Sequence, residues 1–294
     1  MTTPHDISIA YTPDSDDAFY YHALECGHLP SDSFRMAFHT DHIINLNRAA
    51  RVRRYDITAI SSVAYPRLAR DYRVLSVGTS VGRGYGPVLV SRQKCTLEQL
   101  SHKRIGVPGM PTTGGFLMKW VQPQAELVEM QFDKIAGAVA AGELDAGVMI
   151  HEELLFYPRL GLQKIADLGA TWSRHTGLPL PVGLNVVRRE IGLETSQILC
   201  DLIRESLLWA LDHRDEALGW TQQFGRGKAG GVGDQFVSMF ANADSIVLPD
   251  DARTALGVLL KQVKEVGMAD SIPEVEFVDG SPEVTATLSK RIAA

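Results

Sequence analysis

The most prominent candidate for chemistry is His151, which follows the apolar segment LDAGVMI (144–150) and precedes Glu152 and Glu153. An imidazole has an unperturbed pKa of about 6.5, so its neutral form can accept a proton near pH 7. A neighbouring carboxylate can orient the ring and increase its basicity. The alternative is a boundary histidine with satisfied hydrogen bonds, whereas an HExxH zinc motif is excluded because position 155 holds leucine. We therefore predict that His151 acts as a general base.

An acidic cluster formed by Asp14, Asp16 and Asp17 follows the predicted strand DISIAY (6–11). Aspartate near the start of a helix accepts backbone N–H bonds and is favoured by the helix dipole. These residues can therefore simply cap the helix that begins near Ala18. The alternative is that they contact a bound ligand. The spacing favours capping and leaves ligand binding open.

Hydroxyl side chains lie at the ends of two further predicted strands. Ser61 follows DITAI (56–60), and Thr112 and Thr113 follow RIGVPG (104–109). The two glycines after the threonines allow the backbone to approach a ligand closely. A helix that begins there also presents free N–H groups to a carboxylate or phosphate. Helix capping and anion binding are equally compatible with this spacing.

The residues above can meet only if the strands before them share a sheet edge, as the carboxyl ends of strands do in open α/β sheets. Short β-rich segments alternate with helical patterns over the first 150 residues, which is typical of an α/β fold. The predicted strands are 6–11, 34–40, 55–61, 72–80, 87–92, 103–109, 125–131, 144–150 and 182–189. The predicted helices are 18–27, 42–54, 96–103, 112–121 and 132–143, another from Ser62, and a helical region from Thr195.

Two strand-like segments bound the middle of the chain, PVLVSR (87–92) and VGLNVVRR (182–189), and both are flanked by Gly and Pro. This arrangement predicts an inserted lobe over residues 88–188. The first lobe is then discontinuous and consists of residues 1–87 and 189–294. Two crossovers would join the lobes, with a cleft between them.

Composition excludes several classes of protein. The chain has 294 residues, of which 45% are hydrophobic and 22% charged, as in globular proteins. A net charge of −6 and a pI near 5.8 argue against nucleic acid or an anionic membrane as a partner. Cys26, Cys95 and Cys200 are far apart and form no CxxC pair, which argues against a disulfide scaffold or a zinc site. The sequence begins without the features of a signal peptide, so we expect a cytoplasmic protein.

Five segments form a recognisable ordered set: PDSDDAFYYHAL (13–24), DITAISSVAYP (56–66), GVPGMPTTGGFL (106–117), AGELDAGVMIHEELLFYPRLGLQKIADLGATW (141–172) and TGLPLPVG (176–183). This set resembles the 1,4-dihydroxy-6-naphthoate synthase family, the lyases of the futalosine route to menaquinone. The resemblance implies a two-lobed α/β fold like that of type II periplasmic binding proteins. It also implies an enzyme without metal or organic cofactor. Its substrate would be an aromatic carboxylate, cyclic dehypoxanthine futalosine.

The resemblance also implies residue roles: His151 becomes the catalytic base, and Ser61, Thr112 and Thr113 contact the substrate. Asp14, in the acidic opening, is a further substrate-binding candidate. The chain departs from the family in that opening and at Ala59, where some members carry lysine. Two other readings share the fold, namely a non-catalytic small-molecule-binding protein and a chorismate dehydratase. The histidine at a strand end favours an enzyme, and the dehydratases lack this combination of segments.

Overall fold

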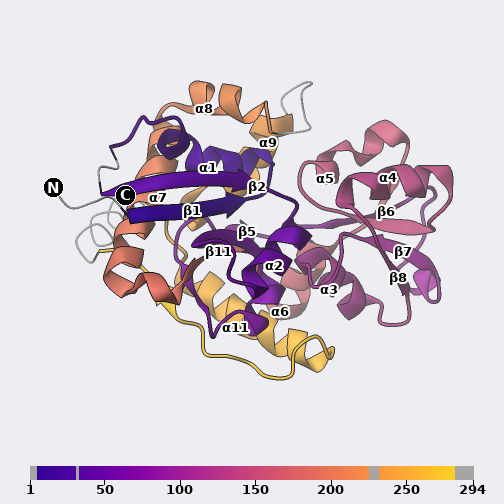
Figure 1. The fold of residues 1–294 in the computed structure, drawn as a ribbon. Helices are drawn as coiled ribbons and strands as arrows, with labels where there is room; N and C mark the ends of the chain where they lie inside the picture. The colour runs from indigo at the N-terminus through magenta and orange to yellow at the C-terminus, as the bar shows by residue number, and fades with distance from the viewer. Residues whose placement is uncertain (1–4, 31–32, 225–231, 282–294) are drawn as a thin grey trace.

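Two β-sheets form the framework of the computed structural model, which describes residues 5–30, 33–224 and 232–281 (Figure 1). The strands of the first sheet are β1 (His5–Tyr11), β2 (Phe34–Thr40), β3 (Ile57–Ser61), β4 (Tyr72–Leu75), β5 (Ser80–Gly82), β11 (Leu180–Arg188) and β12 (Phe277–Val278). Their order is β12-β4-β11-β3-β1-β2, and β5 pairs with β11. β1 runs parallel to both β2 and β3, so the carboxyl ends of β1 and β3 lie at one edge.

The second sheet has the order β10-β6-β9-β7-β8. Its strands are β6 (Val88–Ser91), β7 (Arg104–Val107), β8 (Glu126–Glu129), β9 (Ala146–Met149) and β10 (Gln163–Asp167). β7 is parallel to β8 and β9, which again places the carboxyl ends of β7 and β9 at the same edge. β9 is buried along its whole length, as its apolar sequence predicts.

Helices pack around both sheets. Those that follow strands of the first sheet, or return to it, are α1 (Ser15–Glu25), α2 (Ile43–Arg51), α7 (Leu193–Asp212), α8 (Arg214–Thr221), α9 (Val232–Phe240), α10 (Ala243–Ile246) and α11 (Asp250–Glu265). Those of the second sheet are α3 (Thr113–Val121), α4 (Phe132–Ala141), α5 (Glu153–Phe156) and α6 (Leu168–Thr176). Figure 1 shows α1, α8 and α9 on one side of β1 and β2, and α2 and α11 on the other. None of the helices in the described ranges has the length and apolar content needed to cross a membrane.

The chain leaves the first sheet after β5 and returns to it at β11. Strand β11 pairs with β3, β4 and β5, from Leu180 onward. The predicted boundary at residue 188 had assigned this strand to the inserted lobe, so the return to the first sheet is earlier than that boundary. The composition of a strand shows that it is buried, but not which sheet it joins.

Several predicted elements differ from the structure for local reasons. The predicted strand 72–80 is split into β4 and β5 by a bend that includes Gly78, whose φ of 70° is unfavourable for other residues. The helix predicted from Ser62 is a short 3-10 helix, Ser62–Arg67, that contains Pro66, which cannot donate a backbone hydrogen bond. The helix predicted over 96–103 is reduced to the 3-10 turn Glu98–Leu100. Two further 3-10 helices span Tyr157–Leu160 and Arg189–Ile191.

Strand β10 and helix α6 were not predicted. The start of α6 nevertheless has a clear sequence signal, because the Asp167 side chain caps it by accepting a bond of 2.9 Å from the N–H of Ala170. Gly177, with a φ of 71°, ends the helix. A single hydrophobic cluster includes Ile60 and Leu184 of the first sheet and Val148 of the second. The two sheets are therefore held against each other by a shared core.

Candidate functional site

All five of the predicted site residues line one cavity between the two sheets. Asp14 and Ser61 come from the first sheet, whereas Thr112, Thr113 and His151 come from the second. The cavity encloses about 680 Å³ of empty space, including the part open to solvent, which is within the usual range for small-molecule sites. Each residue lies just beyond the carboxyl end of a parallel strand, or at that end, as the sequence predicted. The two edges face each other across the cavity.

His151 is held by Asp14 across this cavity. Its Nδ1 contacts Asp14 Oδ2, and the two side chains are only 13% and 5% exposed. The backbone of His151 has a φ of 53°, a left-handed conformation that is uncommon outside glycine and concentrates at functional sites. The ring of Phe132 packs against the imidazole with centroids 4.6 Å apart.

The second ring nitrogen of His151 is in a different situation. Nε2 is buried and has no hydrogen-bond partner among the residues that the structure describes. When Nδ1 carries the proton and donates it to Asp14, Nε2 presents a lone pair. An aspartate bound to the other nitrogen both fixes this tautomer and stabilises the imidazolium that forms after protonation. This geometry is compatible with proton transfer to Nε2.

The acidic cluster does not cap α1 in the predicted way. Asp14 is the N-cap residue of α1 by position, but its side chain makes no capping hydrogen bond and reaches His151 instead. Asp17 accepts bonds from the backbone N–H and the hydroxyl of Thr12, at 2.9 and 2.6 Å. Asp16 accepts a bond of 3.1 Å from Ser80. These carboxyl groups therefore bind residues elsewhere in the fold and do not cap the start of α1.

Burial makes this cluster a group of weak acids. Burial, together with the charges of Asp17 and Glu152, raises the pKa of Asp14 well above its usual range. Burial and the charge of Asp14 raise the pKa of Asp16 in the same direction. Two carboxylates so close together cannot both ionise cheaply, so one can retain a proton and donate it to the other. Oxygens of Asp14, Asp16 and Asp17 lie within 4.8 Å of one another, but a cation there would compete with His151 and Thr12.

Glu152 joins the two lobes beside His151. Its Oε1 accepts bonds from both the backbone N–H and the hydroxyl of Ser15, at 2.9 and 2.7 Å. The Glu152 residue is 1% exposed, and Ser15 is 2% exposed. In the sequence, Glu152 stands out only as a neighbour of the histidine. The contact attaches the start of α1 to the loop that carries His151.

Ser61 is positioned by a residue that the sequence did not single out. Asn47 on α2 donates to Ser61 Oγ at 3.1 Å and accepts from the Ser61 N–H at 2.9 Å. The same amide donates to the carbonyl of Pro111 at 2.8 Å, which connects it to the other lobe. Because Asn47 donates to the serine oxygen, the hydroxyl hydrogen of Ser61 remains available for a ligand. The sequence signal for this role was an asparagine on the apolar face of the amphipathic helix predicted over 42–54.

The two threonines use their hydroxyl hydrogens within the protein. Thr112 donates to the carbonyl of Gly109 at 2.7 Å and accepts from the N–H of Gly115 at 3.1 Å, which makes it the N-cap of α3. Thr113 donates to the carbonyl of Val182 at 2.6 Å. Their oxygens can still accept hydrogen bonds, but a carboxylate requires donors. The hydroxyl of Ser61 and backbone N–H groups at the start of α3 meet that requirement.

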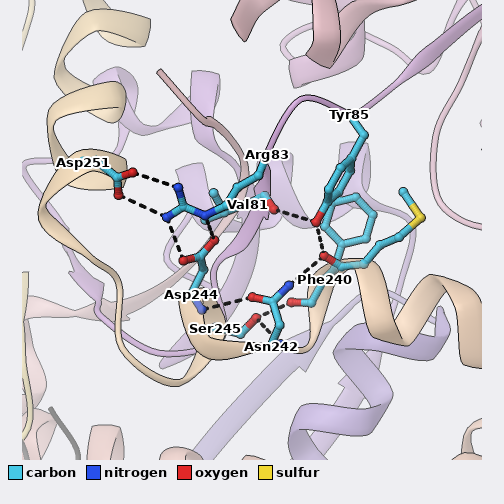
Figure 2. Close-up of polar contacts among 9 residues, drawn as sticks. Val81, Arg83, Tyr85, Phe240, Asn242, Asp244, Ser245 and Asp251 are labelled. Atoms are coloured by element: carbon cyan, nitrogen blue, oxygen red, sulfur yellow. Dashed lines mark hydrogen bonds and ion pairs between the residues drawn. The ribbon is translucent and has the colours of Figure 1, made fainter. Parts of the chain in front are cut away.

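An apolar wall of the cavity comes from α9, which contributes Phe236 and Phe240. The segment after β5 is fastened to this region by Tyr85, whose hydroxyl donates to the carbonyl of Met239. Figure 2 shows Tyr85 beside Phe240. The Tyr85 ring packs edge-on against Phe240, with centroids 5.6 Å apart. Among the described residues that line the cavity there is no lysine or arginine. A negatively charged group on a ligand would therefore have to be bound by neutral hydrogen-bond donors.

The same figure shows a charged anchor on the crossover segment. Arg83 binds Asp244 at 2.6 Å through Nε and Asp251 at 2.8 Å through one terminal nitrogen (Figure 2). The guanidinium lowers the pKa of the Asp251 carboxyl. Asn242 caps α10 by accepting from the N–H of Asp244 at 3.0 Å. These bonds hold the crossover, α9 and α10 in a fixed arrangement around the cavity.

Comparison with known proteins agrees with this architecture. A family model described as menaquinone biosynthesis matches residues 7–265. The chain is 34% identical over 272 residues to a 1,4-dihydroxy-6-naphtoate synthase of Thermus thermophilus, covering 92% of this chain and 99% of that one. A crystal structure of an Archaeoglobus fulgidus protein is similar, with a TM-score of 0.87, 37% identity and coverage of 91% and 100%.

A more distant likeness concerns the fold alone. A Candida albicans protein described as having the generic periplasmic binding protein fold superimposes with a TM-score of 0.68 at 12% identity, covering 98% of this chain and 95% of that one. The predicted two-lobed α/β fold is thereby confirmed.

Proposed function

The chain belongs to the menaquinone biosynthesis family and is an enzyme of that pathway, and we propose that it converts cyclic dehypoxanthine futalosine to 1,4-dihydroxy-6-naphthoate. The reaction is the cleavage of a carbon–carbon bond, which makes the enzyme a lyase. The similarity to the Thermus thermophilus synthase over nearly the whole chain supports this assignment. An enzyme of this biosynthetic type would act in the cytoplasm and need no organic cofactor or metal for the chemical step.

His151 is the proposed general base. The carbon–carbon bond can break only after a proton is removed from the sugar-derived part of the substrate. Nε2 of His151, which has no partner among the described residues, would take that proton, while Asp14 would hold Nδ1–H and stabilise the resulting imidazolium. The raised pKa of the Asp16 carboxyl lets it keep a proton, which it can donate to Asp14 so that Asp14 stays the ionised partner of His151.

The aromatic carboxylate is proposed to bind at the opposite end of the cavity, near Ser61 and the start of α3. The Ser61 hydroxyl and the N–H groups of that helix supply neutral donors, and the helix dipole favours a negative charge there. The rings of Phe236 and Phe240 provide apolar contact for the naphthalene. The end of the cavity near His151 is rich in carboxyl groups, and the end near Ser61 is rich in hydrogen-bond donors. This difference would orient the substrate with its sugar-derived part toward His151.

The single observation that carries the proposal is the buried, unpartnered Nε2 of His151 in the shared cavity. Its test is the His151→Asn variant, which keeps a polar side chain of similar position but cannot act as a base near neutral pH. Because general bases contribute roughly 10²–10⁴-fold, we expect turnover to fall by at least about 100-fold while product affinity is retained. His175→Asn, on α6 outside the cavity, is the matched control.

Two results would contradict the proposal. Turnover of His151→Asn within tenfold of the wild type would remove the histidine from the base role. If the wild-type protein binds cyclic dehypoxanthine futalosine in calorimetry but never releases naphthoate, the non-catalytic binding protein becomes the correct interpretation.

A further inference from the structure

A second cluster of metal-binding side chains lies at the far end of α1, away from the cavity. His22, Cys26 and His28 each offer one ligand atom, and these atoms lie within 4.8 Å of one another. We propose that this trio is a binding site for a divalent transition metal, with Zn²⁺ as the ion that fits the ligand set. Its role would be structural, and the proposed lyase reaction does not depend on it.

The local backbone builds the trio. His22 and Cys26 are four residues apart and therefore lie on the same face of the last turn of α1. Gly27 has a φ of 75° and reverses the chain, and the N–H of His28 bonds back to the carbonyl of Ala23 at 2.8 Å. This helix-terminating turn brings His28 next to His22, with ring centroids 5.3 Å apart. The end of α1 brings the three residues of the spacing H-x3-C-x-H together, and this spacing contains no CxxC pair.

His22 provides a second, independent observation on this cluster. Its residue is only 2% exposed, and its Nδ1 is buried without a hydrogen-bond partner among the described residues. A buried polar nitrogen is normally satisfied, so an orphaned one requires an explanation.

The chemistry of the trio matches zinc better than harder ions. Two imidazole nitrogens and a thiolate are the donors that Zn²⁺ takes in tetrahedral sites, whereas Mg²⁺ and Ca²⁺ prefer oxygen. Tetrahedral zinc ligands are roughly 3.3–3.8 Å apart, so small side-chain rotations from the present separations would suffice. Cys26 is free and exposed, and an ion can therefore enter from solvent.

Glu216 on α8 completes the surroundings of the cluster. Its Oε1 lies 3.3 Å from Nε2 of His28, where it can become a fourth ligand or orient the ring from the outer shell. The stacked ring of Trp209, with its centroid 4.3 Å from that of His28, holds the imidazole in place. With Glu216 as the fourth ligand, a bound ion would fasten the end of α1 to α8.

The test is metal titration of the untagged, reduced, full-length protein, with Zn²⁺ followed by calorimetry and Co²⁺ by absorption. We expect one Zn²⁺ per chain, a rise in melting temperature, and a thiolate-to-cobalt charge-transfer band. Cys26→Ala and His28→Ala remove exposed side chains and should each weaken Zn²⁺ binding by at least about 100-fold, since even outer-shell changes cost about 10–100-fold. Cys95→Ala and His175→Ala are matched controls, because neither residue belongs to the trio and His175 is exposed on α6.

Three results would overturn the proposal. The first is absence of stoichiometric Zn²⁺ binding by the reduced wild-type protein. The second is unchanged affinity in both Cys26→Ala and His28→Ala, which would place the ion elsewhere, for instance on the acidic cluster of Asp14, Asp16 and Asp17. The third is a cobalt spectrum without a thiolate band. Naphthoate formation should be the same in wild type, Cys26→Ala and His28→Ala, so failure of this site is distinct from failure of the proposed reaction.

Discussion

The contact between Glu152 and Ser15 should make a large contribution to the stability of the arrangement of the two lobes. The perturbation is Glu152→Gln, which retains an oxygen acceptor of the same length and removes the charge. Both donors of Ser15, the backbone N–H and the hydroxyl, bind one oxygen of this carboxylate, at 2.9 and 2.7 Å. The two residues are 137 positions apart, so the bonds link the loop after β9 directly to the start of α1.

The expected magnitude follows from these two bonds. A hydrogen bond to a charged group contributes about 1.5–3 kcal/mol, so the pair contributes about 3–6 kcal/mol. Charge-assisted bonds are roughly twice as strong as neutral ones, so a glutamine should retain about half of that value. We therefore expect Glu152→Gln to lower the free energy of unfolding by about 1.5–3 kcal/mol. Relief of the repulsion between Glu152 and Asp14 would place the result at the lower end.

The assay is equilibrium unfolding in urea, with Ser15→Ala and the double variant completing a double-mutant cycle. Glu143→Gln, an exposed glutamate just after α4, is the matched control and should change stability by less than about 0.5 kcal/mol. Residues in direct contact show coupling of about 0.5–3 kcal/mol in such cycles. A loss within about 0.5 kcal/mol of wild type for Glu152→Gln, or strictly additive effects in the cycle, would refute this reasoning.

Three further predictions concern the cavity. Ser61→Ala should weaken binding of 1,4-dihydroxy-6-naphthoate by about 1.5–3 kcal/mol in calorimetry, because the available hydroxyl hydrogen is lost; unchanged affinity would place the carboxylate elsewhere. Asp14→Asn should reduce turnover by about 10²–10⁴-fold with product affinity preserved, because the imidazolium loses its counter-charge; activity close to wild type would show that the contact with His151 is only structural. Asp16→Asn should stabilise the fold, because the pKa of the Asp16 carboxyl is raised in the folded state. Such a carboxyl binds more protons in the folded state than in the unfolded state. Its contribution to the free energy of unfolding therefore declines as pH rises above about 4. The gain in unfolding free energy should therefore be larger at pH 7 than at pH 5, and a gain that shrinks with pH would contradict the raised pKa.

Much of the fold, and the meeting of the candidate site residues in one cavity, could be predicted from the sequence, because both depend on local patterns. Alternation of β-rich and helical segments predicted most strands to within a few residues, and β2 at its observed bounds, Phe34–Thr40. Polar residues after Tyr11 and Met149 were identified as site candidates because parallel strands end at a common edge. Gly27, predicted to stop the first helix, has the left-handed backbone that this role requires.

Only the tertiary structure decided which of these groups are in contact and which of their hydrogen-bond donors remain available. The pairing of His151 with Asp14, and of Glu152 with Ser15, joins segments that no local pattern connects. Packing also determined that Thr113 donates to Val182 while the hydroxyl of Ser61 stays available. The physical reason is that hydrogen-bond donors and buried charges are satisfied by whichever partner the fold brings within about 3 Å, and that partner is set by long-range packing.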